Sequence, residues 1–117
     1  MATEPADHLP LTPAVLHILL ALADERNGKH GYAVAREVED STDGQIRMGP
    51  GTLYGSIQRM LEAELIEERQ GGGRAREEDE RRRYYRLTAL GRRVLALELE
   101  RLTAVVAIAR RKQLLPA

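Results

Sequence analysis

The feature that most constrains the fold of this chain is the stretch of residues 48–66, MGPGTLYGSIQRMLEAELI. Apolar side chains recur in it at positions i, i+4, i+7 and i+8, which is the spacing of one face of a helix. They are Leu53, Ile57, Met60 and Leu61. The pattern predicts a helix over residues 50–63 that packs its apolar face on a core and runs directly into a strand at residue 65.

The opposite face of this predicted helix is small and polar. The residues expected on it are Thr52, Ser56, Gln58 and Arg59. Gly51 and Gly55 would let the helix backbone come close to something bulky. A short helix of this kind, followed at once by a strand, is typical of a DNA recognition helix that leads into the first strand of a wing.

Two predicted helices carry candidate DNA contacts. Thr52 and Ser56 lie near the start of the 50–63 helix, where short hydroxyl side chains can reach base edges. Arg59 is expected to meet a phosphate, the alternative being a solvated helix charge. Tyr54 could contact DNA or pack under the wing. Tyr32, at the start of the preceding helix, could reach a phosphate or pack.

The other elements follow from turn residues and apolar periodicity. Thr12 and Pro13 predict the N-cap and first residue of a helix over residues 13–26. This helix is apolar nearly all round, so it is expected to be buried on more than one side. A second helix is predicted over about residues 31–41. Strands predicted at 65–69 and 82–87 would form one antiparallel hairpin.

The loop between these two strands, residues 70–81, has the sequence QGGGRAREEDER. Three glycines and a dense run of charges predict a mobile tip. In the functional interpretation, Arg74 and Arg76 reach the minor groove or the DNA backbone. In the alternative interpretation, the loop is disordered and its charges cancel.

A final helix, capped by Thr88 and ending near residue 112, carries a coiled-coil seam. Its apolar residues alternate in spacings of four and three. A long helix with this much apolar surface usually pairs with a second copy, which predicts a homodimer. The dimerisation residues expected from the first and last helices are Leu16, Leu19, Leu20, Leu95, Leu99, Leu102 and Val106.

The centre of such a dimer is where a small effector would bind. Leu16, Leu19, Leu20, Leu99 and Leu102, with His17 as a polar contact, would form its wall. The chain contains no Trp and no Phe, so an aromatic sandwich around a flat ligand is excluded. The wall suits an aliphatic or small ligand, or else the same residues form only the core of the dimer.

Several classes of protein are disfavoured by the composition. The chain has no Cys, its three His residues lie in different predicted elements, and no GK[ST] follows its glycine triplet. We therefore expect no metal, no cofactor and no enzymatic activity. No apolar run reaches the about 18 residues that a membrane span needs. Residues 1–10 do not resemble a signal peptide, and a cytoplasmic protein with a flexible N-terminal arm is expected.

The formal net charge of zero conceals an uneven distribution. Residues 1–43 carry eight acidic and three basic side chains, so the rest of the chain has an excess of five bases. All of those bases except Lys112 are arginines, which suit phosphate and guanine. The neutral sum argues mildly against nucleic acid as a partner. The uneven distribution argues mildly for it, because the field at one face matters more than the total.

An ordered set of short motifs narrows these possibilities. The motifs are LTP at 11–13, HGY at 30–32, PGTLY at 50–54, LI at 65–66 and RYYRLT at 83–88 with Gly91. In this order and spacing they resemble the PadR family of bacterial transcriptional regulators, over roughly residues 11–95. The resemblance implies a mainly α fold with a small β-hairpin: a winged helix-turn-helix domain at 11–88 and a C-terminal dimerisation helix at 89–117, after an arm at 1–10.

The resemblance also implies a function, a homodimeric repressor on a palindromic double-stranded DNA operator, often released by a small molecule. Two residues depart from the family pattern. Glu64 stands where the family usually has Gly, and Gly49 stands where it often has Ser as the helix cap. Two alternatives stay open, a winged helix that binds protein instead of an operator and a small-molecule sensor that binds no operator.

Overall fold

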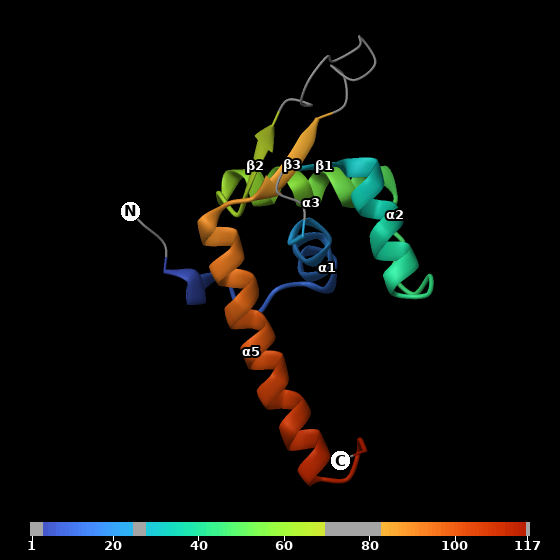
Figure 1. Ribbon diagram of the computed structural model, residues 1–117, viewed down its shortest axis with the longest axis vertical. Helices are drawn as coiled ribbons and strands as arrows, with labels where there is room; N and C mark the ends of the chain where they lie inside the picture. Colours follow the sequence, from blue (N-terminus) through green and yellow to red (C-terminus); the bar gives the residue numbers. More distant parts are fainter. Residues whose placement is uncertain (1–3, 25–27, 70–82, 117) are drawn as a thin grey trace.

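The computed structural model describes residues 4–24, 28–69 and 83–116. Its elements are η1 (Pro5–His8), α1 (Pro13–Leu22), β1 (Lys29–His30), α2 (Gly31–Ser41), α3 (Pro50–Glu62), β2 (Ile66–Arg69), β3 (Tyr84–Leu87) and α5 (Ala89–Arg111). The predicted winged helix fold, mainly helical with a small antiparallel hairpin, is confirmed. Figure 1 shows the sheet and α3 at one end of the molecule and α5 leading away toward the other.

The sheet contains one strand that the sequence did not predict. Its strand order is β1-β3-β2, and both pairings are antiparallel. The hairpin pairs Ile66 with Leu87 and Arg69 with Tyr84, whereas β1 pairs Lys29 with Tyr85. A strand of two residues is too short to show the alternation by which strands are recognised. Only its pairing with β3 makes it a strand.

Helix α1 lies at the centre of the core. Ile18, Leu19 and Leu22 are at most 1% exposed, and α1 contacts α2, α3, β3 and α5. Figure 1 shows it below α3, between α5 and α2. Thr12 is its N-cap, as predicted, and accepts a hydrogen bond from the Val15 N–H. The helix ends at Leu22, earlier than the predicted residue 26.

A tight junction joins the turn after α3 to the start of α5. A Cβ on Gly91 would overlap the carbonyl oxygen of Leu65. The Thr88 hydroxyl donates to the Glu64 carbonyl at 2.6 Å and accepts from the Gly91 N–H at 2.9 Å. Glu64 has φ 61°, the left-handed conformation that glycine adopts freely and another residue adopts at a cost of about 1 kcal/mol. The junction therefore holds a strained turn in place.

We predict that Gly91→Ala lowers the free energy of unfolding by about 3 kcal/mol, because backbone must move to admit the methyl group. Urea denaturation followed by circular dichroism measures it. The control is Gly55→Ala, whose Cβ would meet only the Arg59 guanidinium, at 3.7 Å. Because Ala favours a helix, this control should be neutral or stabilising by up to about 1 kcal/mol. If the two variants were equally stable, the close contact between Gly91 and the Leu65 carbonyl would not be needed for stability.

A buried carboxylate ties the segment before α1 to α5. Glu98 is 1% exposed. Its carboxylate accepts a hydrogen bond from the Leu11 backbone N–H at 2.7 Å and two from the Arg101 guanidinium at 2.5 and 3.1 Å. The hydrogen bond from Arg101 holds the pKa of Glu98 below its ordinary 4.5; burial opposes this, and the Leu11 N–H adds to it. The sequence pattern did not single out Glu98.

The N-terminal segment is more structured than expected. Residues 1–10 were predicted to be a flexible arm, but Pro5–His8 form η1, and η1 contacts α5. The expectation is corrected for these residues. The bond from Leu11 to Glu98 explains the difference, because it fixes the chain on α5 immediately after η1.

The lowered pKa of Glu98 predicts a pH dependence. A carboxylate whose folded pKa lies below the unfolded one stabilises the fold above the unfolded value and loses this effect as pH falls through the folded one. Glu98→Gln should therefore melt several degrees below the wild type at pH 7. As pH falls below the ordinary 4.5 and through the lowered pKa of Glu98, the difference should narrow, because the wild-type carboxyl also becomes neutral. The exposed Glu100→Gln is the control, and a difference for Glu98→Gln that stays constant with pH would contradict the prediction.

Candidate nucleic-acid interface

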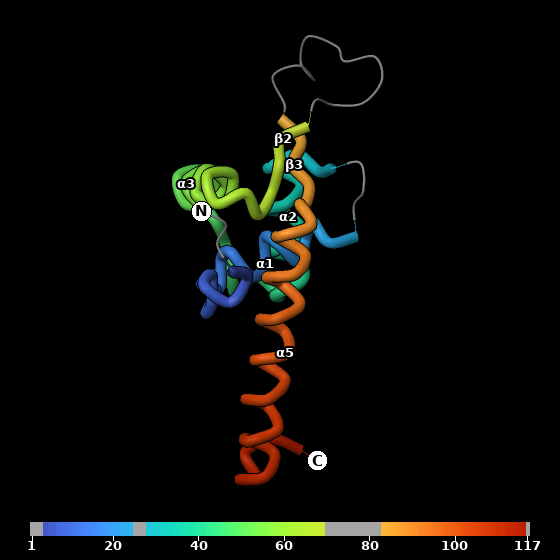
Figure 2. The backbone as a smooth tube through the Cα atoms, turned by 90° about the vertical axis from the view of Figure 1, so that its left-hand side faces the viewer, coloured from blue at the N-terminus to red at the C-terminus, as the bar shows by residue number. Residues whose placement is uncertain are grey.

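The outer face of α3 is the candidate interface. The predicted core face is confirmed, since Leu53, Ile57 and Met60 are at most 4% exposed. Thr52, Tyr54, Gln58 and Arg59 are exposed. Figure 2 shows α3 nearly end-on at the left edge of the molecule, with the sheet and α2 to its right, so its left side faces outward.

The structure corrects one candidate on this helix. Ser56 was expected to read base edges, but it is 1% exposed. Its hydroxyl accepts a hydrogen bond from the Arg59 guanidinium at 3.3 Å. Ser56 lies three residues after Leu53 and four before Met60, so helical spacing places it beside the core face. In this structure Ser56 positions Arg59 and cannot reach a partner at the outer face.

Glycines leave part of the outer face without side chains. A Cβ on Gly51 would have no atom within 4 Å, and a Cβ on Gly55 would meet only the Arg59 guanidinium. Crowding inside the protein therefore does not require glycine at either position, in contrast to Gly91. One turn apart on the same face, they leave a strip of bare backbone, defined here as the glycine strip. A bulky partner can approach α3 closely along it.

The two tyrosine candidates lie on different helices: Tyr32 is at the start of α2, and Tyr54 is on α3, facing that start. Tyr54 is 49% exposed, and its ring crosses Gly31, where a Cβ would be 3.1 Å from the tyrosine hydroxyl. Tyr32 is 64% exposed, with the Arg36 guanidinium 5.9 Å from its ring centre and the His30 ring stacked at 6.4 Å. Both rings pack on one side and remain open on the other. Packing and partner contact are thus compatible for each residue.

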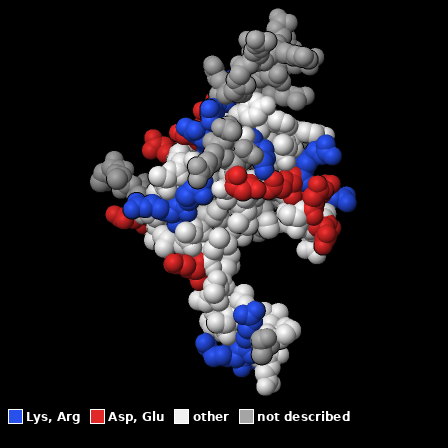
Figure 3. Space-filling view, viewed as in Figure 1, with Lys and Arg blue, Asp and Glu red and all other residues white. Residues whose placement is uncertain are grey.

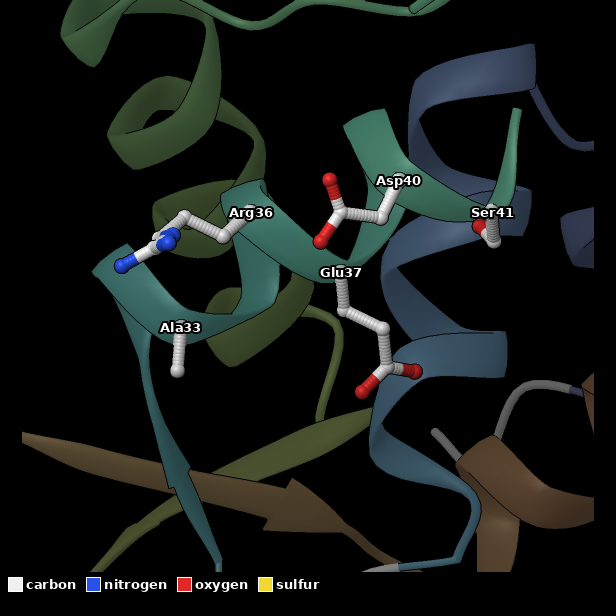
Figure 4. A pocket seen from close by; sticks show the side chains of 5 residues that line it. All are labelled: Ala33, Arg36, Glu37, Asp40 and Ser41. Carbon is white, nitrogen blue, oxygen red and sulfur yellow. The ribbon is translucent and has the colours of Figure 1, made fainter. Parts of the chain in front are cut away.

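Acidic residues gather on a different surface. Figure 3 shows them mainly over α2. A shallow pocket of about 620 Å³ on this helix is lined by Ala33, Arg36, Glu37, Asp40 and Ser41 (Figure 4). Glu37 also pairs with Lys29, whose ammonium group donates to the Ala21 carbonyl at 2.9 Å. The lining holds two carboxylates and one guanidinium, and Lys29 already pairs with one of the carboxylates, so no excess positive charge is left to bind phosphate.

The described part of the hairpin offers little free positive charge. Arg83 pairs with Glu68 at 2.7 Å and Arg86 pairs with Glu67 at 2.5 Å. The two wing-tip candidates, Arg74 and Arg76, lie outside the described residues.

Among residues 4–24, 28–69 and 83–116, no group of three His, Cys, Asp or Glu side chains could hold a metal ion. No helix in the same ranges is long and apolar enough to cross a membrane.

A second surface, the apolar stripe of α5, is defined by Leu99, Leu102, Val105, Val106 and Ile108. Leu99, Val105 and Ile108 are 39%, 48% and 44% exposed, and Leu102 and Val106 are half-buried. Figure 3 shows the middle of the projecting helix as largely uncharged. On α1, Leu20 is 38% exposed and Leu16 is half-buried.

Two of the expected dimerisation residues lie elsewhere. Leu19 is 0% exposed and Leu95 is 5% exposed, so both belong to the core of one protomer. The periodicity of a seam shows that a residue lies on the apolar face of its helix. It does not show whether that face meets the same chain or a second copy.

The fold and the exposed face of α3 define a winged helix-turn-helix protein. The model of the Transcriptional regulator PadR-like family matches residues 18–97, which is more than half of the chain. The chain therefore belongs to the PadR-like family of transcriptional regulators. A search of curated proteins found no match.

Solved structures show the same fold. A transcriptional regulator from Clostridium thermocellum matches with a TM-score of 0.69 and 22% identity, over 84% of this chain and 87% of that one. A PadR family transcription regulator from Clostridium difficile matches with a TM-score of 0.64 and 21% identity, over 84% and 97%. RosR of H. salinarum, in the complex structure of hsRosR-SG, matches with a TM-score of 0.66 and 29% identity, over 92% and 87%.

The glycine strip gives a direct prediction. Gly55→Leu adds a side chain at a half-buried helix position where a Cβ would meet only the Arg59 guanidinium, so thermal stability should be unchanged or raised. If this face meets the DNA, the variant should bind double-stranded DNA at least about tenfold more weakly, because the helix can no longer approach closely. Fluorescence anisotropy with a labelled duplex measures it. Ala104→Leu, on exposed α5, is the control, and unchanged affinity in Gly55→Leu would mean that another face binds.

Proposed function

We propose that this protein is a homodimeric transcriptional repressor in which two copies of α3 enter successive major grooves of a palindromic operator. The observation that carries this proposal is the glycine strip on a helix whose other face is fixed in the core. Membership in a family of transcriptional regulators supports DNA as the partner. In dimers of this kind, the half-sites lie about 34–36 Å apart, one turn of the DNA helix.

The apolar stripe of α5 supports a second copy as the partner of this helix. Three large apolar side chains on it are about two-fifths to one-half exposed within one protomer. An exposed apolar stripe of this length marks an interaction surface, and a symmetric pairing would bury each residue twice. Leu16 and Leu20 of α1 are proposed to extend the contact.

Leu99→Asp tests the dimer. Leu99 is exposed in the protomer, so the substitution should leave the fold intact and convert the dimer to a monomer, since each interface would hold two buried charges. Light scattering with circular dichroism measures both properties. Ala104→Asp places the same charge outside the apolar stripe and should remain dimeric. A folded dimer in Leu99→Asp would refute this interface.

Arg59 is proposed to add affinity through a phosphate contact. Arg59 is exposed, and its guanidinium donates a hydrogen bond to the Ser56 hydroxyl. Arg59→Ala should weaken binding to all sequences alike and reduce the slope of log affinity against log salt by about one unit. Gln113→Ala, beyond the end of α5, is the control. A wild-type protein whose DNA binding does not fall steeply with salt would instead favour the protein-binding alternative.

Thr52, Tyr54 and Tyr32 are proposed to supply the other contacts from α3 and α2. Thr52 would meet a base edge, and the tyrosines would meet the DNA backbone. Arg74 and Arg76, outside the described residues, are proposed to touch flanking backbone or the minor groove.

We further propose that an effector, where one acts, binds at the dimer centre and changes the angle between subunits. Leu16, Leu20, Leu99 and Leu102 would form an aliphatic wall with His17 as a polar contact. Leu19, which the sequence also suggested, is buried in the protomer and cannot take part. An aliphatic wall suits an aliphatic or small ligand.

A further inference from the structure

We propose that Gln58 reads an A·T base pair in the major groove and that Glu62 sets the orientation of its amide. This inference rests on the proposed DNA binding and adds to it the residue that gives specificity. Gln58 is exposed on α3. Its carboxamide Nε2 donates to a carboxylate oxygen of Glu62 at 3.3 Å.

The position of Gln58 follows from the glycine strip. Gly55 lies three residues before Gln58 and Gly51 lies seven before, so helical spacing places all three on one face. Gly51 and Gly55 add no side chain of their own to this face. The long side chains that an approaching duplex would meet are therefore Gln58 and its neighbours Tyr54 and Arg59, whose guanidinium lies beside Gly55. Close approach of the helix would bring its amide to the depth of the base edges.

The chemistry of the amide selects the base. A carboxamide presents a donor and an acceptor side by side, which matches N7 and the N6 amino group of adenine. Arg59, the neighbouring long side chain, has only donors and is already bonded to Ser56. Thr52 carries a single short hydroxyl. Gln58 is therefore the residue on this face that is suited to a two-point contact with adenine.

Glu62 determines which end of the amide carries the donor. An ionised carboxylate only accepts hydrogen bonds, so the nitrogen of Gln58, and not its oxygen, must face Glu62. The nitrogen has a second N–H, which remains available beside the free Oε1. Donor and acceptor thus have a fixed order along α3. The negative charge of Glu62 also disfavours the two acceptors that guanine presents in the groove.

The test is selection from a pool of randomised double-stranded DNA with the full chain. The wild type should enrich a palindromic site, and Gln58→Ala should lose its preference at one A·T pair in each half-site. Discrimination at this pair should fall from roughly 5- to 150-fold to near unity, while other positions keep their preference. Gln113→Ala is the matched control and should enrich the wild-type site. Circular dichroism should show both variants folded, because Ala favours a helix at position 58 and Gln113 lies beyond the end of α5.

Variants of Glu62 separate positioning from direct contact. Glu62→Gln can still accept the bond from Gln58 but lacks the charge, so adenine should stay preferred while guanine is tolerated better. Glu62→Ala should weaken discrimination at the same base pair, with unchanged melting temperature. A role of Glu62 in stability alone would alter the melting temperature and leave base preference at this pair as it was.

Three outcomes would overturn the inference. If Gln58→Ala enriches the wild-type site, or binds all sequences equally more weakly, Gln58 is not a base reader although DNA binding stands. If Glu62→Ala leaves discrimination unchanged, Glu62 has no positioning role. If the wild type enriches no sequence and shows no salt-dependent binding to duplex DNA, the proposed function itself fails, and this inference fails with it.

Discussion

The arrangement of the molecule depends on the close approach of the α5 backbone at Gly91 to the carbonyl group of Leu65. Any side chain at Gly91 would separate the last helix from the turn that follows α3. Thr88 closes the same contact with its hydroxyl and caps α5. Glu64 keeps a positive φ within this junction, although this conformation is unfavourable for a residue with a Cβ. The surrounding bonds therefore hold the end of α3 at a defined place on the start of α5.

Glu98 makes a second attachment to α5, which holds the segment before α1. Its carboxylate fixes the Leu11 backbone just before α1 begins, and α1 is the centre of the core. Two independent attachments along α5 thus orient both the core helix and α3. The outward position of the glycine strip follows from these attachments, because the opposite face of α3 is fixed against the core.

Much of this arrangement could be predicted from the sequence, because the signals are local. Turn residues and apolar spacing located α2 and α3 closely, and Thr88 was recognised as the cap of α5. Two features were missed because they depend on contacts between distant segments. Strand β1 exists only through its pairing with β3, and Glu98 acts through Leu11. Ser56 was misplaced because a polar residue was assumed to face outward, although its spacing from Leu53 already indicated the core side.

Because the junction at Gly91 attaches α5 to the turn after α3, a tilt of α5 would be transmitted to α3. A helix of 23 residues is about 35 Å long, so a tilt of about 5° at its base moves its far end by about 3 Å. The coupling would also act in the opposite direction. If the far ends of two paired α5 helices shifted, each attached α3 would turn with its α5 as a rigid body. Because Thr88 and Gly91 attach α5 directly to the turn after α3, the spacing of two α3 helices in the proposed dimer would be set far from the proposed DNA-binding face. If the protein binds an operator as a dimer, as proposed, mutations near the end of α5 would change the preferred spacing of the half-sites without changing any residue that contacts DNA.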